Sequence, residues 1–302
     1  MEKGIFKSFD GQEISYLFFG TKRDKAKCDI LIMHGMMEHK ERYEEFSEFL
    51  AVNGYNAYVF DIRGHGDLIE AGEVGTFEKG EGMDTVIQDM EFFIKEKMKN
   101  PVLLFGHSLG AILTLKFMEE NIGFDKFILS APPYTGRFNL FMGNMAAGME
   151  GIFKKKKASF LNKNFQKYNE KFQTDNPANT EYEEYNWLSR DENELKKYSE
   201  DLKCGYDVTP KFFQEIFKAM KYSYKNLDKI NKKATSLIIY GTEDPVTEHG
   251  KSVEILKNHL KKEKRKIEIL ENKGGRHESL NEINKYEVYD CILKWLNNLF
   301  TK

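Results

Sequence analysis

Short apolar runs alternate with longer amphipathic segments along residues 13–130. The apolar runs predict strands at Glu13–Phe19, Asp29–Met33, Asn56–Phe60, 101–105 and 124–129. Between them, apolar residues at helical spacing predict helices at 42–52, 83–98 and 108–120. The glycine-rich stretch 63–82 has no clear period and is expected to be a loop. This alternation predicts an α/β fold, with a mostly parallel central sheet and helices on both faces.

The alternation stops after Pro132 and Pro133 and resumes near residue 236. Strands are expected at 236–240 and 266–270, and helices at 248–260 and 286–299. The intervening segment is polar, lysine-rich and helical in pattern, and it is too long for an ordinary connection. We therefore predict a core formed by residues 1–131 and 207–302, with residues 132–206 inserted as a helical cap or lid.

The sequence Gly106-His107-Ser108-Leu109-Gly110 follows the apolar strand at 101–105 and opens a helix. Such a G-x-S-x-G turn holds its serine in a strained conformation, and side chains at the glycine positions would collide with neighbouring elements. Ser108 is thus a candidate nucleophile. The alternative is an ordinary helix start flanked by turn glycines, which the strand before and the helix after make less favourable.

A serine nucleophile needs a histidine base, and the base needs an acid that orients it. Downstream of Ser108, the histidines are His249, His259 and His277. His259 lies inside a helical pattern, and His249 follows the acidic candidates closely. His277 lies in a glycine-rich loop directly after the last predicted strand, which favours it as the base.

The acid is expected after the strand at 236–240, where two carboxylates occur. Asp244 is preferred over Glu243, because Gly241 permits a turn and Pro245 stiffens the neighbouring residue. The oxyanion of an acyl-transfer reaction also needs two backbone N–H donors. Leu109, the residue after the nucleophile, and Met36, in the loop after Asp29–Met33, are the candidates.

Several further motifs occur in the same order as in a known family. They are His34-Gly35-Met36-Met37-Glu38-His39 with Arg42-Tyr43, Asp61-Ile62-Arg63-Gly64-His65-Gly66, Leu188-Ser189-Arg190-Asp191, Asp244-Pro245-Val246 and His277-Glu278. With the serine turn, the chain resembles the α/β-hydrolase family of monoacylglycerol lipases and bacterial lysophospholipase-like serine hydrolases, which is related to serine aminopeptidases. The resemblance implies an α/β-hydrolase fold, a triad of Ser108, Asp244 and His277, and an oxyanion hole of Met36 and Leu109.

Two positions depart from the pattern of that family. Bulky Met36 and Met37 stand where relatives often have small residues, which predicts a narrower pocket floor. Asp67 stands where serine is common, and the sequence suggests no role for it. Cys204 matches a cysteine of similar bacterial sequences, and we expect a small buried apolar residue there rather than a second nucleophile.

A metal site is the alternative interpretation of His34, Asp61, His65 and Asp67. They follow two different strands without a recognised ligand spacing, so no metal is predicted. We expect Asp61 and Arg63 to form a structural ion pair instead.

The inserted segment bears on the substrate. Large apolar residues recur at helical spacing over 138–149 and predict a face, including Phe141 and Met145, that lines an acyl-chain pocket or packs the cap on the core. Phe153 and the lysine run 154–157 suggest transient contact with an anionic membrane surface, although a solvated lysine face is favoured.

Charge and cysteine content exclude several classes of protein. The 302 residues include 46 Lys and Arg against 48 Asp and Glu, a net charge of −2, which argues against nucleic-acid binding. Three separated cysteines form no disulfide framework, and no long apolar run indicates a signal peptide or membrane span. A cytoplasmic location is expected, and oligomeric state is left open.

The predicted function is hydrolysis of lipid-like esters, monoacylglycerol or lysophospholipid, through an acyl-enzyme. This chemistry needs no cofactor and no metal, so activity should resist EDTA. Alternatives with the same triad are a small-ester esterase and an aminopeptidase or amidase, for which Glu181, Glu183 and Glu184 could hold an α-amino group. A non-catalytic binding protein is disfavoured, because all three candidate catalytic residues are present.

Overall fold

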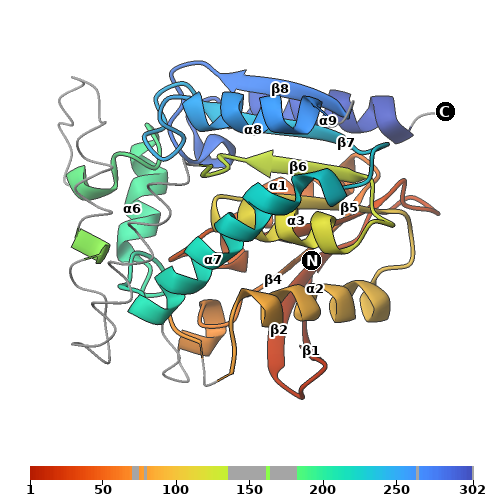
Figure 1. Cartoon of the computed structure of the whole chain (residues 1–302), viewed down its shortest axis with the longest axis horizontal. Helices are drawn as coiled ribbons and strands as arrows, with labels where there is room; N and C mark the ends of the chain where they lie inside the picture. Colours follow the sequence, from red (N-terminus) through yellow and green to blue (C-terminus); the bar gives the residue numbers. More distant parts are fainter. Residues whose placement is uncertain (70–74, 78–79, 135–160, 164–181, 263–264, 301–302) are drawn as a thin grey trace.

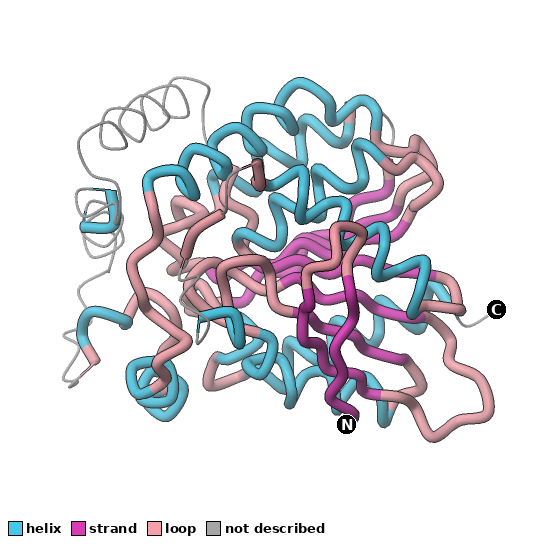
Figure 2. The backbone as a smooth tube through the Cα atoms, turned by 90° about the horizontal axis from the view of Figure 1, so that it is seen from below, coloured by secondary structure: helices cyan, strands magenta, loops and turns pink. Residues whose placement is uncertain are grey.

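The computed structural model describes residues 1–69, 75–77, 80–134, 161–163, 182–262 and 265–300. In this part of the chain eight strands form one sheet, with helices on both of its faces (Figures 1 and 2). The predicted apolar face at 138–149, Phe153, the lysine run 154–157 and Glu181 lie outside the described residues, as does most of the predicted cap.

The strands follow the order β1-β2-β4-β3-β5-β6-β7-β8 across the sheet. β1 and β2 are antiparallel to their neighbours, and the strands from β4 onward pair in parallel. Their bounds are β1 Glu2–Lys7, β2 Glu13–Phe19, β3 Asp29–Met33, β4 Asn56–Phe60, β5 Val102–His107, β6 Lys126–Ser130, β7 Thr235–Gly241 and β8 Lys266–Asn272.

The described α-helices are α1 Glu44–Val52, α2 Met83–Lys97, α3 Leu109–Glu120, α6 Glu192–Glu200, α7 Pro210–Asn226, α8 Lys251–Lys261 and α9 Lys285–Phe300. Short 3₁₀ turns occur at Lys40–Tyr43, Gly66–Ile69, Glu183–Tyr185, Leu227–Lys229 and Ser279–Asn281. None of the helices in the described ranges is long and apolar enough to cross a membrane.

Each face of the sheet has its own apolar core. Side chains alternate along a strand, so Leu31 and Met33 of β3 pack on one face while Ile30 and Ile32 pack on the other. The first face is covered by residues of α2, α3, α7 and α8, and the second by residues of α1 and α9. Burial on both faces explains why the central strands are almost continuously apolar.

The predicted fold class is confirmed, and all seven predicted strands are present with small shifts at their ends. Two elements escaped the pattern analysis. β1 is mostly exposed and only Phe6 is buried, so its apolar signal is weak. α7 directly follows the predicted cap and was not assigned, although Thr209 caps it and Pro210 begins it. The boundaries of the cap stay a prediction.

Candidate active site

Ser108 lies at the turn between β5 and α3. Its backbone angles are φ 50° and ψ −110°, a region that side-chain-bearing residues rarely adopt. A Cβ atom at Gly106 would lie 2.1 Å from the carbonyl oxygen of Gly110, and one at Gly110 would lie 2.0 Å from that of Met33. Both glycines are therefore needed for the strand and helix to approach this closely, the geometry expected of a nucleophile turn.

Asp244 and His277 meet beyond the ends of β7 and β8, which are parallel neighbours. The Nδ1 atom of His277 lies 3.0 and 3.1 Å from the two carboxylate oxygens of Asp244. Both side chains are almost fully buried, and the Val246 N–H donates to the same carboxylate at 2.8 Å. A buried carboxylate bonded to Nδ1 fixes the ring orientation and leaves Nε2 for other chemistry.

The side chains of the other candidates for the acid and the base have other partners. The Glu243 carboxylate is 3.9 Å from Nδ1 of His249, whose ring also bonds the Thr242 carbonyl oxygen. His259 is half-buried on α8 and bonds the Ile255 carbonyl one turn earlier. Of the candidates from the sequence, the structure brings together Asp244 and His277.

Two neighbouring histidines beside the serine have pKa values that are shifted in opposite directions. The rings of His107 and His277 lie 4.8 Å apart between centroids. Burial opposes the charge of His277, but the Asp244 carboxylate raises its pKa above the ordinary value of 6.5. Burial and the neighbouring charge of His277 lower the pKa of His107 to about 3. His107 is therefore neutral at all ordinary pH values, and His277 is the ring that can exchange a proton.

Ser108 and His277 line one small pocket of about 20 Å³, with room for a water molecule. Met36, Met37 and Trp187 also line it. Leu109 is the first residue of α3, so its N–H has no acceptor within the helix. This arrangement can support nucleophilic attack by a hydroxyl, with the Leu109 N–H at the same turn.

The comparison with protein families matches residues 24–284 to the family described as serine aminopeptidase, S33. The chain belongs to this family. Its relatives include the monoglyceride lipase of Saccharomyces cerevisiae, 24% identical over 37% of each chain, and the phospholipase YtpA of Bacillus subtilis, 28% identical over 37% of this chain and 42% of the relative. The match thus spans less than half the length of these two proteins. The monoglyceride lipase homolog of Monkeypox virus is 23% identical over 90% of each chain.

Solved structures agree in fold. A thermostable carboxyl esterase from Bacillus coagulans has a TM-score of 0.83 at 20% identity, covering 99% of this chain and 98% of the esterase. A soluble variant of the Saccharomyces cerevisiae monoglyceride lipase, solved with a substrate analog, has a TM-score of 0.75 at 16% identity, covering 100% and 95%. The resemblance drawn from the motifs is confirmed, and this member of the serine aminopeptidase family has the α/β-hydrolase fold.

Buried ion pairs of Arg42 join the loop that contains Met36 to the loop that contains His277. The guanidinium of Arg42 pairs with Glu278, next to His277, and its Nε atom lies 3.1 Å from Glu38, in the loop that carries Met36. The Tyr43 hydroxyl donates to Glu38 at 2.8 Å. The sequence contained these residues as motif members but gave them no role, because their partners are far apart in the chain.

The segment before α6 also contacts the histidine loop. The N–H groups of His277 and Glu278 donate to the carbonyls of Trp187 and Leu188 at 3.2 and 2.8 Å. The Trp187 ring lies 5.2 Å from that of His277. Sequence reasoning missed Trp187, although tryptophan occurs only twice in the chain.

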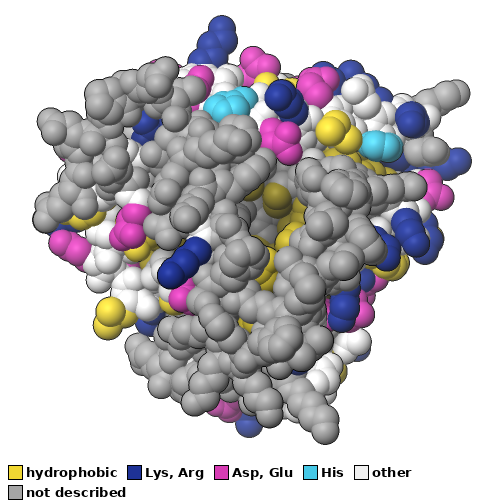
Figure 3. Space-filling model, turned by 60° about the vertical axis from the view of Figure 1, so that its left-hand side comes forward, with side chains coloured by type: hydrophobic (Ala, Val, Ile, Leu, Met, Phe, Trp, Pro, Cys, Tyr) yellow, Lys and Arg dark blue, Asp and Glu magenta, His cyan; other side chains and the backbone are white. Residues whose placement is uncertain are grey.

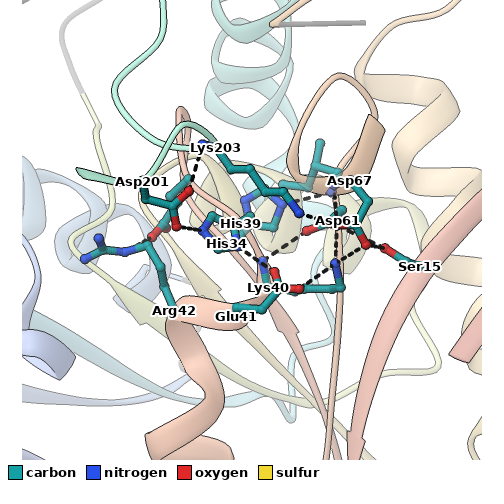
Figure 4. A network of polar contacts seen from close by, with 12 residues as sticks. Ser15, His34, His39, Lys40, Glu41, Arg42, Asp61, Asp67, Asp201 and Lys203 are labelled. Carbon is teal, nitrogen blue, oxygen red and sulfur yellow. Dashed lines mark hydrogen bonds and ion pairs between the residues drawn. The ribbon is translucent and has the colours of Figure 1, made fainter. Parts of the chain in front are cut away.

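The predicted ion pair between Asp61 and Arg63 is wrong. Asp61 accepts hydrogen bonds from the Nζ and backbone N–H of Lys40, at 2.6 and 3.0 Å (Figure 4). Arg63 instead makes a two-pronged contact with Asp89, at 2.7 and 2.8 Å. Asp61 is thus paired with Lys40 and Arg63 with Asp89. These contacts take the place of the predicted ion pair between Asp61 and Arg63.

The other polar residues near Asp61 have structural partners. Nε2 of His34 accepts the Ile62 N–H at 2.9 Å, and the His34 ring packs on that of His65. Asp67 accepts hydrogen bonds from Ser15, Lys40 and Lys203, which gives this unusual residue an anchoring role (Figure 4). Cys204 is buried beside an apolar cluster, as predicted, but its sulfur also contacts the polar side chain of His39.

Proposed function

We propose that the protein hydrolyses carboxylic esters of lipid-like molecules, monoacylglycerol or lysophospholipid, through an acyl-enzyme. The observation that carries the proposal is the buried pair of Asp244 and His277, of which His277 lines the same pocket as Ser108. A hydroxyl nucleophile, an imidazole and an orienting carboxylate together make an acyl-transfer site.

In this mechanism the Ser108 hydroxyl attacks the ester carbonyl while His277 accepts its proton at Nε2. The Asp244 carboxylate stabilises the imidazolium, and the N–H groups of Met36 and Leu109 donate to the oxyanion. His277 then gives the proton to the departing alcohol, which leaves the acyl group on Ser108. Water, deprotonated by the same ring, releases the acid and restores the serine.

A lipid-like acyl group is favoured by the apolar side chains beside Ser108 and by the relatives. Met36, Met37 and Leu188 line the pocket beside Ser108, and flexible apolar side chains accommodate irregular acyl chains. On the side of the molecule that carries α6, some hydrophobic side chains are visible near the middle of the face (Figure 3). The relatives named above include monoglyceride lipases and a phospholipase.

The test is a parallel measurement of turnover on monoacylglycerol, lysophosphatidylcholine, p-nitrophenyl esters of increasing chain length and aminoacyl amides. Medium and long esters should exceed acetate, because each buried CH₂ contributes about 0.8 kcal/mol. The Ser108→Ala variant is the background control. A flat chain-length profile would contradict the lipid assignment and favour a small-ester esterase.

The cap at 132–206 is proposed to hold the acyl chain. Replacement of Phe141 and Met145, which lie outside the described residues, by serine should remove the long-chain advantage while acetate hydrolysis stays nearly unchanged. If this face only packs the cap on the core, the same variants should lose stability and hydrolyse every ester more slowly.

An aminopeptidase is the second candidate, because the matched family carries that description. It would need acidic side chains to hold an α-amino group, the role suggested for Glu181, Glu183 and Glu184. Aminoacyl amide turnover above that of all esters, lost in Ser108→Ala, would establish this alternative.

A further inference from the structure

We propose that His39, Asp201 and Cys204 bind a transition-metal ion, with Zn²⁺ as the best fit. One ligand atom from each residue lies within 4.8 Å of the others. These residues do not line the pocket of Ser108, and the proposed hydrolysis does not use them. The inference therefore stands independently of the proposed function.

Two of the ligands come from one turn. Asp201 and Cys204 are separated by two residues, and the Cys204 N–H donates to the Asp201 carbonyl oxygen at 2.9 Å. This is the spacing at which a short loop presents a pair of zinc ligands, as in C-x₂-C sites. In this pair an aspartate stands at the first position, so the sequence has no C-x₂-C motif there.

The third ligand, His39, comes from the loop after β3 and is already oriented. Its Nε2 atom lies 2.7 Å from Asp201 Oδ2, and its Nδ1 atom lies 2.5 Å from Glu41 Oε2. Metal-binding histidines usually donate their second ring N–H to such a carboxylate, which fixes the tautomer and strengthens the ligand. Nε2 is thus directed at the metal position, with Glu41 as its support.

The donor set and surroundings select the ion. A thiolate and an imidazole favour Zn²⁺ or Co²⁺ over Mg²⁺ and Ca²⁺, which prefer oxygen ligands. His39 is buried, with 5% of its side chain exposed, whereas Asp201 is 34% exposed. His39, Glu41 and Asp201 line a surface cavity of about 870 Å³ that several other carboxylates also border, namely Glu44, Glu45, Glu194 and Glu200. This cavity provides an entry path and space for water as the fourth ligand.

Metal binding needs both ligand atoms in their unprotonated forms. A Zn²⁺ ion coordinates a neutral imidazole nitrogen and a thiolate, so any proton held on Nε2 of His39 or on the Cys204 sulfur is released to water when the ion binds.

The ion would join the segment after α6 to the loop beside the active site. The two are already in contact, because the Gly205 N–H and the Tyr198 hydroxyl each donate to the Met37 carbonyl oxygen at 3.0 Å. Lys203 also pairs with Asp67 at 2.5 Å (Figure 4). Coordination by His39 from one side and by Asp201 and Cys204 from the other adds a stronger tie at the same place and should stabilise the fold.

The experiment titrates the metal-free full-length protein with Co²⁺ and follows its absorption spectrum. A thiolate-to-cobalt charge-transfer band and intense tetrahedral bands should appear at one equivalent and disappear when Zn²⁺ is added. Cys204→Ala should lose the thiolate band, whereas Cys291→Ala, which removes an exposed thiol, should keep it. Glu41→Gln should weaken Zn²⁺ affinity about 10- to 100-fold.

Melting temperature provides the second readout and checks folding. Zn²⁺ should raise the melting temperature of the unmodified protein and of Cys291→Ala, but not that of Cys204→Ala or Asp201→Asn. Absence of a thiolate band in the unmodified protein would overturn the proposal. So would a band that survives in Cys204→Ala and disappears in Cys291→Ala, because the ion would then lie at the exposed thiol.

Discussion

His277 and His39 are both buried and both bonded to carboxylates, but the two regions use the imidazole differently. His277 commits one nitrogen, Nδ1, to Asp244 and lines the pocket of Ser108. His39 has a carboxylate at each nitrogen, Glu41 on one side and Asp201 on the other. A ring with one committed nitrogen can pass a proton, whereas a ring with two partners holds a fixed charge or a metal ion.

The electrostatics of the two rings follow from these partners. Burial disfavours the imidazolium in both regions. At His39 the hydrogen bonds with Cys204 and Glu41 outweigh burial and raise the pKa to about 10. At His277 the single carboxylate raises the pKa above 6.5. The number of acceptors on the ring, rather than burial itself, separates the two roles.

The largest effect should come from removing the nucleophile on the His277 side. Ser108→Ala should lower ester turnover by about 10⁶-fold and abolish labelling by a fluorophosphonate probe, because no other group takes the place of the hydroxyl. Thermal unfolding should change little. Labelling that survives the substitution would show that the reactive serine lies elsewhere.

Matched aspartate variants test the comparison directly. Asp244→Asn should lower kcat by about 10⁴-fold through loss of the correct imidazole tautomer. Asp201→Asn, at His39, should leave kcat within a few-fold, since it touches no reacting atom. Initial rates on a p-nitrophenyl ester measure both. Glu243→Gln is the control at the neighbouring carboxylate, and if it proved more damaging than Asp244→Asn, the acid would be misassigned.

Arg42 tests how the loop beside His277 is held. Arg42→Leu leaves Glu38 and Glu278 buried without their cation, and this should cost about 3–5 kcal/mol of unfolding free energy. Chemical denaturation measures the loss. Lys197→Leu is the control, because Lys197 is an exposed ion-pair partner of Glu194. It should lower the free energy of unfolding by no more than about 1 kcal/mol. Equal costs for the two variants would contradict the bridging role of Arg42.

The pH dependence of kcat/KM should show a smaller effect, which reports the pKa of His277. His277 must be neutral to accept a proton, and its pKa is raised, so kcat/KM should fall about tenfold per pH unit below a midpoint that lies above 6.5. Asp244→Asn should move the midpoint of the residual activity downward, because the stabilising charge is lost. A midpoint below 6.5 in the unmodified protein would mean that burial outweighs Asp244.

Local patterns were enough to predict most of the fold and the serine turn. Continuous apolar runs identified the buried strands, and paired glycines marked a turn where a Cβ atom would collide with backbone. The order of strand ends placed Asp244 and His277 on adjacent loops, because parallel strands deliver their carboxyl ends to one edge of the sheet.

The sequence by itself determined most of the elements, the glycine turn and a short set of candidate residues, since backbone preferences and burial act over a few neighbouring positions. Only the tertiary structure decided which charges meet. It paired Asp61 with Lys40 instead of Arg63, placed Arg42 between Glu38 and Glu278, and brought Asp201 to His39 from 162 residues away. Such contacts depend on the direction in which each side chain leaves its element, and that direction is fixed only when the elements pack together.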